Sequence, residues 1–188
     1  MKIGLFFGSF NPIHNGHLAI AKSIYNKGYF EQIWFVVSPN NPFKDKEELM
    51  NEQDRLNMVK LAIKDFLFLR ASDVEFSLPI PSYTIDTLHK LEQQYPDCEF
   101  SIILGSDNMK DFYKWKNYEK ILERYAIYIY PRNEKENHKY LEHPNIVFLE
   151  MPLIPVSATE IRNLLRQKES TKDFLPELVL QYLTSLNI

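Results

Sequence analysis

Short apolar runs alternate with longer amphipathic stretches along this chain. Strand-length runs rich in β-branched and aromatic residues occur at Ile3–Phe7, Ile33–Val37, Phe100–Leu104, Tyr125–Tyr130 and Ile146–Leu149. Stretches with the 3.6-residue spacing of amphipathic helices lie between them, at Leu18–Tyr25, Glu52–Lys64 and Thr84–Gln94. Near-continuous apolar strands that alternate with helices are typical of a parallel sheet covered on both faces. The pattern therefore predicts an α/β fold of the doubly wound class.

The last part of the chain has a different pattern. Two prolines follow the last apolar run, and two helical patterns come after them, at Ala158–Gln167 and Pro176–Leu186. We expect these to form a helical C-terminal cap at about residues 156–188. A chain of 188 residues fits one domain at roughly 100 to 200 residues per domain, so we expect a single domain over residues 1–188.

Composition and charge exclude several classes of protein. The chain is 45% hydrophobic, enough for a sizeable core, and its net charge of -3 gives no basic surface for nucleic acid. A single cysteine, Cys98, allows neither an internal disulfide nor a CxxC site, which favours a reducing compartment. No apolar run has the length of a membrane span or of a signal-peptide core. We expect a cytoplasmic protein with no membrane and no nucleic-acid partner.

The first apolar run is followed by a segment that combines glycines with histidines. It reads Gly8-Ser9-Phe10-Asn11-Pro12-Ile13-His14-Asn15-Gly16-His17, with a helical pattern starting near Gly16. A glycine at a strand end allows close backbone approach, and a helix N-terminus presents N–H groups to an anion. We therefore predict a phosphate site here. His14 and His17 would place two imidazoles at the same helix mouth.

Two other interpretations of the histidine pair stay open. A zinc site needs a further ligand, and His89, His138 and His143 show no suitable spacing. The pair can also be two solvated side chains without a role. Neither GxxxxGK[ST] nor GxGxxG occurs, which disfavours P-loop kinases and NAD-dependent dehydrogenases.

The segment from Gly8 to His17 resembles the HxGH signature of the nucleotidyltransferase superfamily. A second segment, Val156-Ser157-Ala158-Thr159-Glu160-Ile161-Arg162, is similar to that superfamily's ISSTxIR motif. The resemblance implies a Rossmann-like core. It also implies that Ser157 caps a helix facing phosphate, although a plain N-cap is the alternative.

The segments between these motifs resemble, in order, those of the bacterial nicotinate mononucleotide adenylyltransferases. They are Ser38–Lys44, Pro81–Leu88, Ile103–Asn108, Trp115 and Pro131-Arg132, and the similarity runs from Lys2 to about Leu186. This resemblance implies transfer of AMP from ATP to nicotinate mononucleotide, giving deamido-NAD and pyrophosphate in NAD biosynthesis. The attacking phosphate is itself the nucleophile, so catalysis reduces to alignment and charge neutralisation.

The resemblance also assigns roles to individual residues. It implies that the catalytic residues are His14 and His17. It implies that the ATP-binding residues are Gly8, Ser9, Phe10, Gly105, Asp107, Arg132, Ser157, Thr159 and Arg162. It implies that the substrate-binding residues are Asn40, Lys44, Thr84 and Trp115. Magnesium is expected to arrive with ATP, bridged by oxygens, and we predict no dedicated protein metal site.

Plainer interpretations exist for three of these residues. Lys44 can be a solvated loop lysine, Asp107 an N-cap, and Trp115 a core residue.

The chain departs from the family pattern at four places. These are Asn11 in place of Asp, Asn41-Pro42-Phe43-Lys44 in place of PPHK, Lys116 in place of an aromatic residue, and Pro131-Arg132-Asn133 in place of RPG. These departures leave the preference for nicotinate over nicotinamide mononucleotide open. Other acceptors such as phosphopantetheine, cytidylyl transfer, and a nucleotide-binding regulatory module without turnover are the rival functions. The pattern specifies no oligomeric state.

Overall fold

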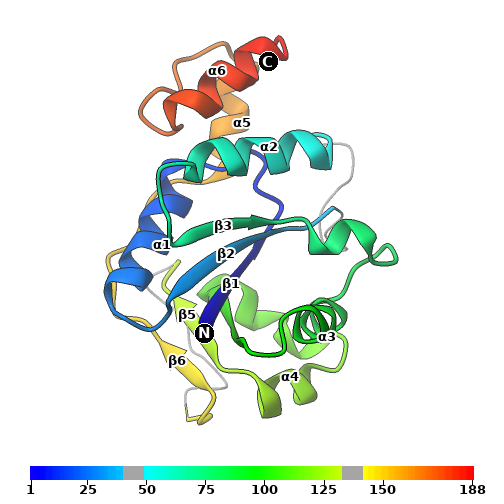
Figure 1. Cartoon of the computed structure of the whole chain (residues 1–188). Helices are drawn as coiled ribbons and strands as arrows, with labels where there is room; N and C mark the ends of the chain where they lie inside the picture. The colour runs from blue at the N-terminus through cyan, green and yellow to red at the C-terminus, as the bar shows by residue number, and fades with distance from the viewer. Residues whose placement is uncertain (40–48, 133–141) are drawn as a thin grey trace.

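A parallel β-sheet forms the centre of the molecule. The computed structural model describes residues 1–39, 49–132 and 142–188. In this part of the chain the sheet has six strands in the order β3-β2-β1-β4-β5-β6 (Figure 1). All neighbouring strands pair in parallel. The strands are β1 (Lys2–Gly8), β2 (Gln32–Val37), β3 (Leu69–Ser72), β4 (Glu99–Gly105), β5 (Ile127–Tyr130) and β6 (Ile146–Phe148).

Helices connect the strands and cover both faces of the sheet. The α-helices are α1 (Asn15–Asn26), α2 (Glu52–Ile63), α3 (Thr84–Gln94), α4 (Tyr118–Arg124), α5 (Ala158–Arg166) and α6 (Glu177–Ser185). Short 3-10 helices are η2 (Val74–Ser77), η3 (Ser106–Lys110) and η4 (Phe112–Lys114). Figure 1 shows α1 and α2 on one face, with α3 and α4 on the other. The predicted doubly wound parallel sheet is confirmed.

The two hydrophobic clusters follow from the two-residue period of the strands. In β1, Phe6 packs with α1 and α2, whereas Ile3 and Leu5 pack with α3 and α4. Because successive side chains of a strand point to opposite faces, a continuous apolar run is required where helices cover both sides.

The order of the strands creates a crevice at the carboxyl edge of the sheet. The chain runs outward from β1 through β2 to β3, and then returns to place β4 on the other side of β1. The loops after β1 and β4 therefore lead to opposite faces. Ligands of open α/β sheets bind at such a switch point, outside the strand ends. The Gly8–His17 segment follows β1, so the fold places it at this crevice.

The predicted C-terminal helical cap is present as α5 and α6. Tyr182 on α6 donates a hydrogen bond to Asp54 Oδ1 on α2 at 2.8 Å, and Asn57 Nδ2 donates to the Tyr182 hydroxyl at 3.1 Å. The Asn15 N–H at the start of α1 donates to the carbonyl of Phe174 at 2.8 Å. The end of the chain is thus tied to the helix that begins at the histidines.

Two elements of the fold lack a clear sequence pattern. Strand β3 has four residues including the exposed Arg70, and α4 has seven residues of mixed polarity. Tyr125, predicted to start a strand, is instead the C-cap of α4, and its hydroxyl donates to Glu92 at 2.7 Å.

None of the helices in the described ranges has the length and apolar character needed to cross a membrane.

Candidate active site

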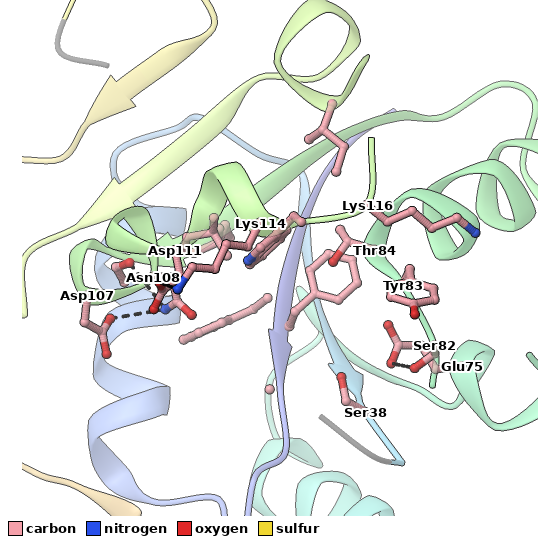
Figure 2. Close-up of a pocket in the computed structure, with 18 of the residues that line it drawn as sticks. Ser38, Glu75, Ser82, Tyr83, Thr84, Asp107, Asn108, Asp111, Lys114 and Lys116 are labelled. Atoms are coloured by element: carbon pink, nitrogen blue, oxygen red, sulfur yellow. Dashed lines mark hydrogen bonds and ion pairs between the residues drawn. The ribbon is translucent and has the colours of Figure 1, made fainter. Parts of the chain in front are cut away.

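A cavity of about 460 Å³ opens at the carboxyl ends of β1, β2 and β4 (Figure 2). It collects residues from segments far apart in the sequence. Predicted site residues in its wall are Gly8, Thr84, Gly105, Asp107 and Trp115. The family resemblance assigns Gly8, Gly105 and Asp107 to ATP and Thr84 and Trp115 to the other substrate. The fold brings all five to one cavity.

Thr84 and Trp115 reach the cavity from different elements. Thr84 is the first residue of α3, and Trp115 is the C-cap of η4. The half-buried Trp115 ring also lies 5.2 Å from the ring of Phe112, which is fully buried. Trp115 therefore packs on the core with one part and lines the cavity with another, so the two interpretations of this residue are compatible.

Gly105 and Asp107 form a tight corner after β4. A Cβ on residue 105 would collide with the Asp107 carboxylate and come within 3.0 Å of Arg132 Cγ. The Asp107 side chain is half exposed, accepts from Asn108 Nδ2 at 3.2 Å and lies 4.0 Å from Arg132 Nε. Asp107 belongs to the first turn of η3, whose N-cap is Gly105. The N-cap interpretation of Asp107 is therefore wrong, and its carboxylate projects toward solvent and Arg132.

His14 and His17 are stacked at the start of α1. Their ring centroids lie 3.7 Å apart with an interplanar angle of 27°. The His14 backbone N–H donates to His17 Nδ1 at 3.3 Å. Because this nitrogen accepts a hydrogen bond, the neutral His17 ring carries its proton on Nε2. The hydrogen bond to Nδ1 thus fixes which nitrogen of His17 is the donor and how the ring is oriented.

His14 is buried and neutral. Its exposed fraction is 2%, and burial, followed by the positive charge of Arg132, lowers the pKa of His14 from 6.5 to about 3. The His14 side chain faces the His17 N–H in a capping-box arrangement, but within the described residues its buried Nδ1 makes no full hydrogen bond. A neutral ring beside a cation is ready to receive an anion, because an anion would offset both causes of the lowered pKa.

The ring of Phe10 packs against this turn. Phe10 is 2% exposed, has a positive φ of 45° and packs edge-on against His17, with centroids 5.1 Å apart. A Cβ on residue 8 would meet this ring at 2.8 Å, so glycine is needed there. The Phe10 side chain is therefore a core group, and only its backbone is free to contact a nucleotide.

The second motif begins α5 and contacts the first. Ser157 is the N-cap, since its hydroxyl accepts from the Glu160 N–H at 3.2 Å. Arg162 Nη1 donates to the Asn11 carbonyl at 3.0 Å, and Nη2 lies 3.3 Å from Thr159 Oγ1. The structure thus brings the two motifs together through Arg162. Ser157 and Thr159 are both exposed at the start of this helix.

Comparison with known proteins identifies the family. A family model described as cytidylyltransferase-like matches residues 5–164. A protein of Flavobacterium johnsoniae named "Probable nicotinate-nucleotide adenylyltransferase" is 47% identical, over 100% of this chain and 98% of its own length. One of the same name from Cytophaga hutchinsonii is 49% identical, over 92% of this chain and 90% of its own. This chain belongs to the nicotinate-nucleotide adenylyltransferase family.

Solved structures agree with the fold of this adenylyltransferase family. The structure of Plasmodium falciparum nicotinic acid mononucleotide adenylyltransferase complexed with NaAD superposes with a TM-score of 0.84 at 24% identity, covering 100% of this chain and 96% of that one. The same protein complexed with APC superposes with a TM-score of 0.82. At this level of identity the likeness demonstrates the Rossmann-like fold.

Two predicted substrate-binding residues of this family member, Asn40 and Lys44, lie outside the described residues. The remaining predicted positions gather at two adjoining places. Gly8, Thr84, Gly105, Asp107 and Trp115 line the cavity. The turn before α1 and its contacts hold most of the others, which are Ser9, Phe10, His14, His17, Ser157, Thr159 and Arg162. Arg132 lies at the corner after β4, beside Asp107, and its charge acts on His14. In the described ranges no cluster of three His, Cys, Asp or Glu side chains has the arrangement of a metal site.

Two buried charged residues at this site had no predicted role. Glu75 lines the cavity at 3% exposure and accepts hydrogen bonds from Ser82 at 2.8 Å and Thr87 at 2.9 Å. Burial raises the pKa of Glu75, and these hydroxyl donors act in the opposite direction. Arg55 on α2 is fully buried beneath the strand ends. A sequence indication existed for Arg55 alone, because it falls on the apolar face of its helix.

Proposed function

We propose that this protein transfers AMP from ATP to nicotinate mononucleotide, releasing pyrophosphate and forming deamido-NAD, a step of NAD biosynthesis. The observation that carries the proposal is that the cavity and the turn before α1 adjoin at the switch point of the sheet. The cavity holds Thr84 and Trp115, and the adjoining turn holds the stacked histidines. The names of the relatives at 47% and 49% identity support the same reaction.

The chemistry requires the site to align two polyanions. The 5′-phosphate of the mononucleotide attacks the α-phosphate of ATP in line, and pyrophosphate leaves. We assign to His14 and His17 the donation of hydrogen bonds to the ATP phosphates as charge builds on the leaving group. Arg132, whose field reaches His14, supplies positive charge on the same side. No side chain needs to form a covalent intermediate.

The remaining roles divide between the two substrates. We assign the adenosine ribose to Asp107, because its carboxylate is exposed beside Gly105 at the end of β4. The Trp115 ring is assigned to stack on the pyridine, and Thr84 at the start of α3 to bind the carboxylate or ribose. Gly8, Ser9 and the Phe10 backbone remain predicted nucleotide contacts.

The helix that begins at Ser157 is proposed to face the phosphates together with Thr159 and Arg162. The roles of Asn40 and Lys44 stay predictions. Magnesium enters as part of the substrate, Mg-ATP, held by phosphate oxygens. We infer a cytoplasmic location from the single cysteine and the biosynthetic reaction.

Pyrophosphate release from Mg-ATP tests the reaction and its acceptor together. Purified protein is offered nicotinate mononucleotide, nicotinamide mononucleotide and phosphopantetheine in parallel, with CTP replacing ATP in a second series. We expect release with ATP and nicotinate mononucleotide well above every other pair. Release with a different acceptor, or with CTP, would replace the substrate assignment. Saturable ATP binding without release under all conditions would contradict the enzyme and favour a regulatory nucleotide-binding module.

A further inference from the structure

Arg55 is a fully buried cation that binds only backbone carbonyls among the described residues. Its guanidinium donates to four of them. The acceptors are the carbonyl oxygens of Ser9 at 2.6 Å, Ser38 at 2.7 Å, Met50 at 2.9 Å and Pro39 at 3.0 Å. The Ser9 carbonyl follows β1, those of Ser38 and Pro39 follow β2, and that of Met50 precedes α2. One side chain thus fastens the loops at the ends of two adjacent central strands.

Burial of this group needs a reason beyond packing. Burial lowers the pKa of Arg55, with Glu52 acting in the opposite direction. No carboxylate among the described residues pairs with this guanidinium. Its burial therefore carries a desolvation cost that an apolar side chain on the same helix face avoids. The neighbours of Arg55 on that face include Leu56, Met58 and Val59, which are buried and apolar. Unlike these apolar side chains, Arg55 carries several N–H donors in one rigid plane.

The hydrogen bond to Ser9 fixes the direction of the next peptide group. The peptide between Ser9 and Phe10 is trans, since the cis bonds of the described chain are elsewhere. In a trans peptide the C=O and the N–H point in opposite directions. Arg55 draws the Ser9 carbonyl toward α2, so the Phe10 N–H faces away from α2. Within the described residues this N–H donates no hydrogen bond to the protein.

A second arginine holds the other side of the same turn. Arg162 donates to the Asn11 carbonyl at 3.0 Å, and Phe10 lies between the two fastened carbonyls with its positive φ. Its ring is fixed against Gly8 and His17. The backbone around Phe10 is therefore held from α2, from α5 and by its own side chain. This rigidity suits a hydrogen-bond donor that must be aimed before the ligand arrives.

We propose that Arg55 is a positioning residue of the phosphate site, which acts by holding the Ser9 carbonyl so that the Phe10 N–H is directed at the phosphates of ATP. The inference rests on the proposed binding of ATP and does not depend on which acceptor is used.

Amide NMR of the full-length, 15N-labelled protein tests this role. The probe is the non-hydrolysable analogue α,β-methylene-ATP with magnesium. In the wild type we expect the Phe10 amide signal to move on titration. In Arg55→Lys, which keeps the charge but loses the planar fork, we expect that movement to disappear and the affinity for the analogue to fall by roughly tenfold or more. Amides of α3 and α4 should keep their free-state positions.

A matched control separates positioning from stability. Tyr182→Phe removes the hydroxyl contacts to Asp54 and Asn57 on the same helix without touching the turn. Its melting temperature should fall while its affinity and its Phe10 response stay as in the wild type. If Arg55→Lys likewise kept its affinity and Phe10 response, the positioning role would be contradicted.

The wild-type titration tests whether the Phe10 N–H meets the phosphates, even if Arg55→Lys does not fold. A Phe10 amide that does not respond to the bound analogue would overturn the proposal. An analogue that binds and moves the Phe10 signal, in a protein that releases no pyrophosphate with any acceptor, would overturn the proposed function and leave the role of Arg55 standing.

Discussion

The imidazole rings of His14 and His17 stack at the mouth of α1, with the His14 backbone N–H donating to His17 Nδ1. This hydrogen bond sets the orientation of His17 and leaves Nε2 to carry the proton. His14 is the buried member of the pair, and His17 is half-buried. The pair therefore combines a desolvated ring near Arg132 with a ring that ligands can reach.

Replacing His17 with alanine should slow catalysis. If Nε2–H stabilises charge on the phosphates in the transition state, His17→Ala lowers kcat by roughly 10² to 10³. Steady-state pyrophosphate release measures this. His89→Ala, an exposed histidine on α3, is the control and should turn over as the wild type does. Unchanged kcat in His17→Ala would remove the assigned role.

The low pKa of His14 predicts a specific acid lability. The group has a pKa of about 3 in the folded state against 6.5 as its ordinary value, so the unfolded chain binds more protons between these values. Stability from this group is fully present above about pH 6.5 and is lost as the pH falls toward 3. The slope is at most about 1.4 kcal/mol per pH unit.

Urea unfolding at several pH values measures that slope. His14→Gln keeps a polar group of similar length but does not titrate, so its free energy of unfolding should depend less steeply on pH over the same interval. Equal slopes for the two proteins would show that His14 is not a source of the acid sensitivity. Saturating α,β-methylene-ATP should reduce the wild-type slope, because a bound polyanion raises the pKa of His14.

An added methyl group at residue 105 should damage the ATP side of the site. In Gly105→Ala the Cβ collides with the Asp107 carboxylate and lies 3.1 Å from the Tyr130 hydroxyl. The corner after β4 must then shift, at a cost of roughly 1 to 3 kcal/mol in stability. We expect KM for ATP to rise more than KM for nicotinate mononucleotide. Gly28→Ala is the control, because that residue has a φ of 76° and open space around it, so its cost is in stability alone.

The sequence predicts the part of the site that lies in one continuous segment of the chain. The segment from Gly8 to His17 carries its own turn, helix start and histidine pair, so its position at the end of β1 follows from the strand and helix patterns around it. The cavity wall is different, because Thr84 and Trp115 meet only through the sheet order. Strand β3 and helix α4 were not predicted, since four residues containing an exposed arginine and seven residues of mixed polarity give too few positions for a period.

Arg55 shows a second limit of sequence patterns. Its partners are the carbonyl oxygens of Ser9, Ser38, Pro39 and Met50, and a backbone carbonyl is present at every residue whatever its side chain. No motif can therefore specify this contact. What the sequence does contain is a cation on a helix face that is otherwise apolar, and such a position predicts a buried donor that has found acceptors.

Lys116 is expected to influence the choice between acid and amide acceptors. It lines the cavity next to Trp115. Its Nζ lies 2.8 Å from Asp86 Oδ2 and 4.9 Å from the centre of the Tyr83 ring. The ion pair is well exposed, at 44% and 38%, so it adds little to stability. Its ammonium group nevertheless lies on the side of the cavity formed by Thr84, which is assigned to the carboxylate or ribose of the substrate.

Removing this charge should weaken discrimination. Lys116→Gln should raise KM for nicotinate mononucleotide several-fold, by about 0.5 to 1 kcal/mol of lost attraction, and leave KM for nicotinamide mononucleotide and for ATP unchanged. Asp86→Asn provides the opposite test, because it frees Lys116 from its partner and should strengthen the preference for the acid. The ratio of kcat/KM for the two acceptors measures both effects. If Lys116→Gln and Asp86→Asn moved that ratio in the same direction, the ion pair would act as a structural link between α3 and the segment that joins η4 to α4, and the electrostatic role would be wrong.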